Sequence, residues 1–225
     1  MFKKVLILCL LLILLTGCGK RKLELVKLET IDSIAIVSMR FNRELVSKYK
    51  SKFSTALEYE ERQFYTDFSR KVENVVKNNI DLKFKDIKKF EKSKYYKRLT
   101  KRSGLHRTVY YPKPYRSLNY KDTKRLSQIA SDLNVDAVAV IDFYYIPFAS
   151  KMPFKKKYKF KLVSKIIVVN QYAETVAKYH ISSPKLRASR SLEIEKTGFT
   201  AETMNFYTDL MEAFYARLED VITLK

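Results

Sequence analysis

The side chains that most often carry enzymatic or metal chemistry are few in this chain of 225 residues, which contains two histidines and two cysteines. His106 lies in a basic stretch and His180 near the end of an apolar run, and neither has cysteines or suitably spaced acidic residues around it. A metal site needs three or four His, Cys or carboxylate ligands. A Gly-x-Ser-x-Gly motif is missing, and four glycines leave little material for a phosphate-binding loop. We therefore predict no catalytic residue, no metal, no cofactor and no enzymatic activity, with an enzyme whose active site is scattered along the chain as an alternative.

Asp142 is the acidic residue with the most unusual surroundings, because it lies inside the apolar run 135–146. A carboxylate in a buried strand can have a perturbed pKa and act as a general acid or base. We favour a structural role, in which Asp142 faces an edge of the sheet, forms an ion pair with one of the 45 Lys and Arg residues, or caps the end of the strand. Asp136, at the start of the same run, is expected to stabilise a turn between a helix and a strand.

The N-terminus has the parts of an export signal: two lysines followed by the apolar run 5–15. That run is shorter than the roughly 20 apolar residues that a membrane-spanning helix needs. The tetrad Leu-Thr-Gly-Cys at 15–18 resembles the lipobox of bacterial lipoproteins. The resemblance implies cleavage between Gly17 and Cys18, diacylglycerol on the Cys18 thiol and acylation of the new amine. An ordinary secretory signal followed by an incidental cysteine is the alternative.

A lipidated N-terminus predicts both the organisation and the location of the chain. Residues 1–17 would be the signal peptide, 18–30 a tether, and 31–225 a single globular domain. Two or more acyl chains anchor a protein stably in a membrane, and the three basic residues at 20–22 would lie against anionic head groups. We expect the cell envelope, with the periplasmic side of the outer membrane favoured and the cell surface as the alternative.

Basic residues outnumber acidic ones, 45 to 24, and they gather in two clusters. Residues 92–118 contain nine Lys or Arg, no acid and five interleaved tyrosines. In a cytosolic protein such a stretch would suit single-stranded nucleic acid, with tyrosines stacking on bases, but the export signal argues against a nucleic-acid partner. We predict contacts with an anionic lipid, glycan or envelope protein, and a merely solvated basic face is the alternative. The candidate contact residues are Lys97, Arg98, Lys101, Arg102, Lys155, Lys156 and Lys157.

Hydrophobic residues make up 46% of the chain, enough for a sizeable core. Apolar periodicity predicts two long amphipathic helices, 60–80 and 200–224, the second burying Tyr207, Leu210, Phe214 and Leu218. A third helix is expected from an Asn119 cap to Asn134. Strands are predicted at 33–41, 135–146, 159–170 and 172–181, with a hairpin around 170–171, and 81–92 is predicted to be a strand or an extended segment. A loop is expected at 42–55, and 93–119 is expected to be mostly loop. The predicted fold class is α/β, or α+β, with a mixed sheet of about five strands and packed helices.

Three segments resemble the periplasmic lipoproteins with a TolB N-terminal-like domain, the group that includes CsgG and LpoB. They are SIAIVSM at 33–39, RLSQIASDLNVDAVAVIDFYYI at 125–146 and KLVSKIIVVNQYAETVAKYHI at 161–181. The Asp-Gly that is usual at the hairpin tip is absent. The resemblance implies a TolB-N-like fold and a role in binding or assembly within the envelope. A surface adhesin that holds anionic glycans through its basic clusters is the alternative function.

Overall fold

The computed structural model describes residues 31–42, 55–79, 82–105, 109–149, 158–187 and 208–218. Residues 208–218 are helical, and the other elements in chain order are β1 (Ser33–Asn42), α3 (Thr55–Asn79), β2 (Lys83–Phe84), α4 (Ile87–Phe90), α5 (Lys94–Leu99), β3 (Gly104–Leu105), β4 (Val109–Tyr111), α6 (Thr123–Leu133), β5 (Ala137–Ala149), β6 (Tyr158–Asn170), β7 (Thr175–Ser182) and β8 (Leu186–Arg187). No helix within these ranges is both long and apolar enough to cross a membrane.

All the strands belong to one mixed sheet, which confirms the predicted α/β class. The strand order is β3-β4-β1-β5-β6-β7, with β2 added beside β1 and β8 beside β6. β1 runs parallel to β5 and to β2, and the other pairs are antiparallel. β1 and the first half of β5 are buried on both faces of the sheet, which explains why both are nearly continuous apolar runs.

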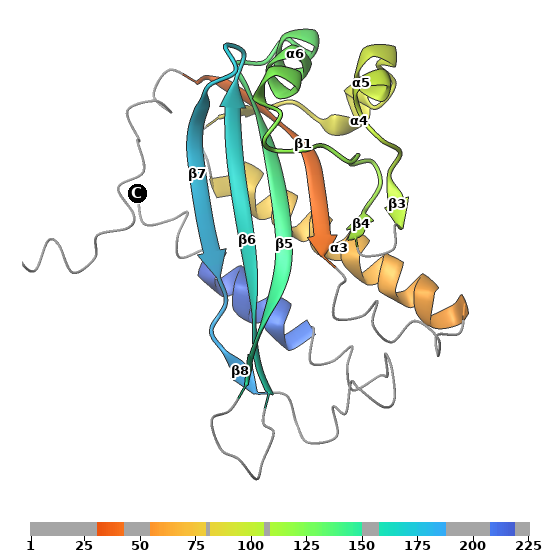
Figure 1. Ribbon diagram of the computed structural model, residues 1–225, viewed down its shortest axis with the longest axis vertical. Coiled ribbons are helices and arrows are strands. Elements are labelled where there is room, and N and C mark those ends of the chain that lie inside the picture. The colour runs from red at the N-terminus through yellow and green to blue at the C-terminus, as the bar shows by residue number, and fades with distance from the viewer. Residues whose placement is uncertain are drawn as a thin grey trace, which may run out of the picture.

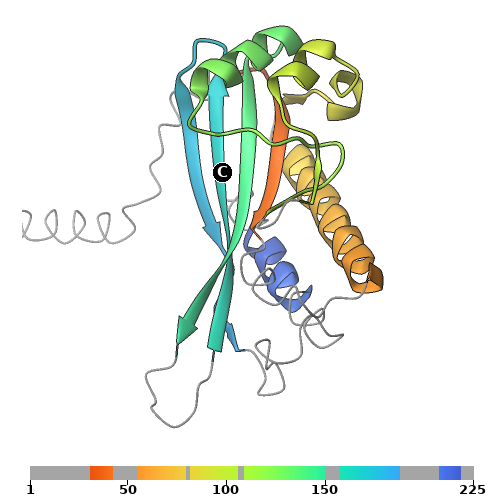
Figure 2. The ribbon, with the colours of Figure 1, turned by 45° about the vertical axis from the view of Figure 1, so that its right-hand side comes forward.

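One face of the sheet packs against α3 and the helix at 208–218, which lie on the same side in Figure 2. Aromatic side chains fill this layer. Phe41 of β1 stacks on Phe143 of β5 with ring centroids 4.8 Å apart. Phe68 of α3 and Phe214 meet the Phe143 ring edge-on, at 5.1 and 5.7 Å. The predicted burial of Leu210, Phe214 and Leu218 is confirmed, whereas Tyr207 lies outside the described residues.

The opposite face is covered mainly near one end of the sheet. There α6 packs against β5 and β6, and α4 and α5 lie beside it. The chain from β4 to α6 then crosses in front of the sheet (Figure 1). We call the end where α4, α5 and α6 lie the helical end; β1 also begins there, because Ser33 pairs with Lys83 of β2 just before α4.

The segment 93–119, predicted to be mostly loop, also contains α5, β3 and β4. Helix α5 is short, and it begins where the Ser93 hydroxyl accepts a hydrogen bond from the backbone N–H of Tyr96. In the strand or extended segment predicted at 81–92, the strand is limited to β2, since residues 87–90 form α4. Helix α6 begins after Asp122 rather than Asn119; the Asp122 carboxylate accepts from the backbone N–H of Arg125.

The hairpin between β6 and β7 is wider than the predicted turn at 170–171. The Asn170 side-chain oxygen accepts hydrogen bonds from the backbone N–H groups of Tyr172 and Glu174, at 3.0 and 2.9 Å. Ala173 adopts a left-handed conformation with φ of 65°. The asparagine side chain therefore organises a four-residue loop without the usual Asp-Gly pair.

Candidate functional site

Eight basic side chains gather on α4, on α5 and on the residues that flank α5. We call this group the α4–α5 basic surface; its members are Lys88, Lys89, Lys92, Lys94, Lys97, Arg98, Lys101 and Arg102, and all of them are exposed. Within the described part of the chain, none of them forms an ion pair with an acidic residue. Four of the predicted contacts, Lys97, Arg98, Lys101 and Arg102, thus lie together. Lys155, Lys156 and Lys157 lie outside the described residues, as do Gly17, Cys18 and His106.

Two acidic residues near the α4–α5 basic surface are engaged in local hydrogen bonds, and one further acid, Glu91, lies between α4 and α5. Asp86 caps α4 by accepting from the backbone N–H of Lys88 at 2.9 Å. Asp132 of α6 accepts from the Ser93 hydroxyl at 2.8 Å. Because these carboxylates fix helix ends and contacts between helices, they leave the basic side chains facing solvent as a positively charged patch.

Four of the five tyrosines that alternate with these basic residues in sequence are buried, whereas Tyr95 is half-buried and has the Arg98 guanidinium 5.4 Å from its ring centroid. Tyr96, Tyr110, Tyr111 and Tyr115 are all less than 9% exposed. The Tyr96 hydroxyl donates to the carbonyl of Val37 at 2.6 Å, and the Tyr115 hydroxyl donates to Glu73 at 2.6 Å. These rings attach the 93–118 segment to the sheet and to α3, so they are unavailable as stacking platforms for bases.

A row of polar side chains crosses the face of the sheet that α3 does not cover. The strand register places Arg40, Asp142, Lys165 and His180 beside one another on β1, β5, β6 and β7. Arg40 Nη2 donates to Asp142 Oδ2 at 2.5 Å, and this ion pair is one of the structural roles predicted for Asp142. Burial raises the pKa of Asp142 even though the charges of Arg40 and Lys165 oppose the shift. Desolvation and the nearby Lys165 ammonium lower the pKa of His180.

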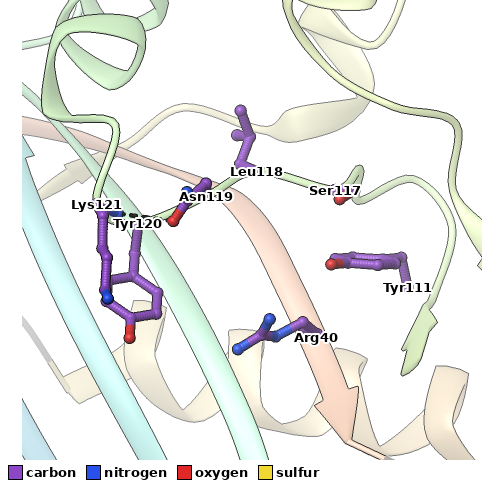
Figure 3. A pocket seen from close by; sticks show the side chains of 7 residues that line it. All are labelled: Arg40, Tyr111, Ser117, Leu118, Asn119, Tyr120 and Lys121. Carbon is purple, nitrogen blue, oxygen red and sulfur yellow. Dashed lines mark hydrogen bonds between the residues drawn. The ribbon is translucent and has the colours of Figure 1, made fainter. Parts of the chain in front are cut away.

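A shallow pocket of about 380 Å³ lies directly above Arg40. Its wall is the crossing segment between β4 and α6, and Figure 3 shows the Arg40 guanidinium reaching into the space between Tyr120 and Tyr111. The Lys165 ammonium lies 3.8 Å from the centroid of the Tyr120 ring. Through hydrogen bonding and its charge, this lysine lowers the pKa of Tyr120.

The crossing segment is held firmly against the sheet. The Ser38 hydroxyl donates to the carbonyl of Arg116 at 2.7 Å, and Ser117 forms a β-bridge with Lys101. Tyr115 and Leu118 are buried on either side of these contacts. The pocket wall is therefore part of the folded core and does not depend on a ligand for its position.

The chemistry available in this pocket is that of binding. Its lining combines two basic side chains with hydroxyl and amide groups, namely Arg40, Tyr111, Ser117, Leu118, Asn119, Tyr120 and Lys121. The described residues contain no group of three or more His, Cys, Asp or Glu that could hold a metal ion. Sequence analysis missed this site because Arg40 and Lys121 are 81 positions apart in the chain, and only the sheet register and the crossing segment bring them together.

Comparisons with known proteins leave the chain without an assigned family. No family model and no curated protein sequence matches it. Among solved structures, lipoprotein GNA1162 from Neisseria meningitidis aligns with a TM-score of 0.34 and 11% identity, over 82% of this chain and 97% of that one. The hypothetical protein CT253 from Chlamydia trachomatis aligns with a TM-score of 0.32 and 10% identity, over 87% of this chain and all of the other. These values establish no relationship, and the resemblance to the CsgG and LpoB group gains no support from them.

Proposed function

We propose that this protein is a lipid-anchored lipoprotein of the bacterial cell envelope that acts as a non-catalytic binding or assembly factor. The lipobox-like tetrad at 15–18 supports the anchor. The anchor restricts the protein to a membrane surface, where its α4–α5 basic surface engages anionic lipid head groups.

The observation that carries this proposal is that the α4–α5 basic surface lies at the end of the sheet where β1 begins, which is the end that the proposed tether would join. Ile31 and Asp32 lead into β1 at the helical end, and the backbone N–H of Lys83 donates to the carbonyl of Asp32 at 2.8 Å. Residues 18–30 span at most about 45 Å even when fully extended. A short tether from Cys18 thus keeps the helical end near the membrane, and a basic patch there adds electrostatic attraction to anionic head groups.

Lipidation is tested by the substitution Cys18→Ser. Because the thiol is the atom that would carry diacylglycerol, this variant should incorporate no alkyne-tagged palmitate and should accumulate as the unprocessed precursor. Metabolic labelling followed by gel electrophoresis measures both effects, with Cys9→Ser as the matched control that keeps label and processing. Acyl label retained on the Cys18→Ser variant would refute the anchor.

Docking on anionic head groups is tested with residues 19–225, produced without lipid. At low salt this chain should bind vesicles that contain phosphatidylglycerol and should leave them at high salt, because the Debye length falls from about 10 Å at 0.1 M to 3 Å at 1 M. Reversal of Lys97, Arg98, Lys101 and Arg102 to Glu should remove most of the binding seen in flotation assays. The thermal midpoint should hardly change, since exposed charges contribute little to stability.

The matched control reverses four exposed lysines away from the helical end and changes the net charge equally: Lys71, Lys113, Lys178 and Lys185. This control should keep most of the vesicle binding. If both variants lose binding to the same extent, net charge alone drives the association, and the proposed surface is wrong. Protease treatment of intact cells separately distinguishes a protected periplasmic protein from one displayed at the surface.

A further inference from the structure

The pocket above Arg40 is separate from the α4–α5 basic surface and has a different construction. The α4–α5 basic surface consists mostly of exposed lysines on or beside two short helices. The pocket instead contains Arg40, whose guanidinium is paired with the buried carboxylate of Asp142. The Asp142 side chain is 7% exposed and that of Arg40 is 36% exposed. The carboxylate lies beneath the guanidinium, and the guanidinium faces outward.

Asp142 holds the Arg40 side chain in place for a ligand. A buried carboxylate needs its cationic partner, because removal of one partner leaves an uncompensated charge in a low-dielectric environment. A guanidinium carries five N–H donors in a planar fork, and Asp142 accepts from Nη2. Among the described residues no other acceptor engages the Arg40 guanidinium, so donors remain for a group that enters the pocket (Figure 3).

The charges around the pocket are unbalanced. Arg40 and Lys121 line it, and Lys165 lies next to it over the Tyr120 ring. Asp142 is the one carboxylate of the described chain in contact with this group, and it offsets one of the three positive charges. Two positive charges remain to be matched, which favours a dianionic group over a singly charged carboxylate.

The polar groups on the pocket wall are of the kind that bind phosphate oxygens. The Asn119 side-chain oxygen is occupied by the backbone N–H of Lys121 at 3.0 Å, so its amide N–H₂ is the part that can donate to a ligand. The hydroxyl of Ser117 adds a further donor along the wall. Arginine binds phosphate oxygens in pairs through its planar fork, and the volume of about 380 Å³ accommodates a phosphate with a small organic substituent.

We propose that this pocket binds the phosphate group of a phosphomonoester, with Arg40 as the central contact and Lys121 and Asn119 as contacts on the rim. A phosphomonoester can be a small soluble molecule or the head group of a lipid such as phosphatidic acid. Arg40 lies near the C-terminal end of β1, away from the helical end that the proposed tether would join. This position favours the soluble source.

The test uses the full-length chain in nanodiscs of neutral phosphatidylcholine at constant ionic strength, titrated by calorimetry. Inorganic phosphate and glycerol 3-phosphate should bind saturably, and glycerol should not. Lys121→Gln should weaken phosphate binding at least tenfold, whereas Lys124→Gln, an exposed lysine on α6 outside the pocket, should leave it unchanged. Arg40→Lys keeps a cation for Asp142 but loses the planar fork, and it should also weaken binding at least tenfold while the thermal midpoint stays close to that of the wild type.

A second arm distinguishes the two sources of phosphate. Nanodiscs that contain phosphatidic acid are titrated with glycerol 3-phosphate, using the chain with Lys97, Arg98, Lys101 and Arg102 reversed so that the α4–α5 basic surface does not contribute. Binding of glycerol 3-phosphate that is unchanged by phosphatidic acid supports the soluble source. Loss of glycerol 3-phosphate binding in the presence of phosphatidic acid, when that loss depends on Arg40, supports the same pocket occupied by the lipid head group. The proposal is overturned if neither phosphate binds saturably, or if Lys121→Gln and Lys124→Gln have equal effects.

Discussion

Asp136 connects distant parts of the chain with a single side chain. Its Oδ2 accepts from the backbone N–H and the hydroxyl of Ser33, at 2.8 and 2.7 Å, and from the backbone N–H of Asp32 at 3.1 Å. These bonds, with the Ser33 hydroxyl first, lower the pKa of Asp136. A carboxylate at the turn from α6 into β5 therefore also fixes the start of β1.

Replacement of Asp136 by Asn should destabilise the fold by about 1–3 kcal/mol at pH 7, because an amide N–H₂ cannot accept these hydrogen bonds. The folded-state pKa of Asp136 is lowered, so its contribution is complete above the usual carboxyl pKa of about 4 and is lost as the pH falls through the lowered value. The difference between wild type and Asp136→Asn, measured by urea unfolding, should thus shrink from pH 7 to pH 3.

Asp132→Asn is a suitable control, because Asp132 is exposed and accepts a single side-chain hydrogen bond, from Ser93. Its effect should be smaller than that of Asp136→Asn. A stability difference for Asp136→Asn that grows with acidification would contradict this account.

Sequence patterns predicted the roles of Asp136 and Asp142 but not their partners. A carboxylate inside an apolar run needs a hydrogen-bond donor or a cation as its partner, and this need can be predicted from the neighbouring residues in the sequence. The choice of Arg40 for Asp142 depends on the parallel register of β1 and β5, including an irregularity between Ile36 and Ser38. Such a shift changes which side chains face each other, and a single sequence carries no visible signal for it.

At the level of elements, long apolar periodicity predicted α3 and the C-terminal helix, whereas α4 and α5 were missed. A helix of four or six residues is too short to show a hydrophobic period. The available signals were the caps, since Asp86 and Ser93 each precede a helix and accept from its backbone N–H groups. The basic run drew attention to the correct surface, but its helical form depends on Tyr96 and Phe90 packing into the core.

The helix at 208–218 should depend strongly on one aromatic side chain. Phe214 is 1% exposed and lies against Phe68 and Phe143. Phe214→Ala should lower the free energy of unfolding by about 3–5 kcal/mol, because it removes buried area and leaves a cavity. Glu212→Ala on the same helix is the matched control; its exposed ion pair with Lys71 should contribute less than about 1 kcal/mol. Equal effects of the two substitutions in urea unfolding would mean that this helix does not close the core.

For the whole molecule, one cluster of buried side chains extends from Ile31 to Leu218. We therefore expect residues 31–225 to unfold in a single cooperative transition. Far-ultraviolet circular dichroism and tyrosine fluorescence, which the 16 tyrosines provide in a chain without tryptophan, should give the same midpoint in urea. Two separate midpoints would show that the predicted single domain is divided.

The fold class was predictable because alternating and continuous apolar runs specify which faces are buried. The family was not, since the segments that resemble TolB N-terminal-like domains share hydrophobic patterns that many sheets require. Basic and aromatic residues that alternate in sequence were largely separated by the fold, with four of the five tyrosines buried and the lysines exposed. Sequence alone could not show this separation, because it follows from how the 93–118 segment wraps the sheet.

The long antiparallel pairing of β5 with β6 fixes how far the sheet extends from the helical end. β1 stops pairing with β5 at Phe143 and β7 ends one residue pair further on, so that among the described strands β6 and then β8 accompany the rest of β5, as the lower part of Figure 1 shows. The twelve steps from Ala137, beside the start of β1, to Ala149 span about 40 Å at 3.3 Å each. With the helical end resting on the membrane as proposed, β5 and β6 hold their far end about 40 Å above the head groups. Removal of two residue pairs from this extension should bring anything bound there closer to the bilayer by about 7 Å.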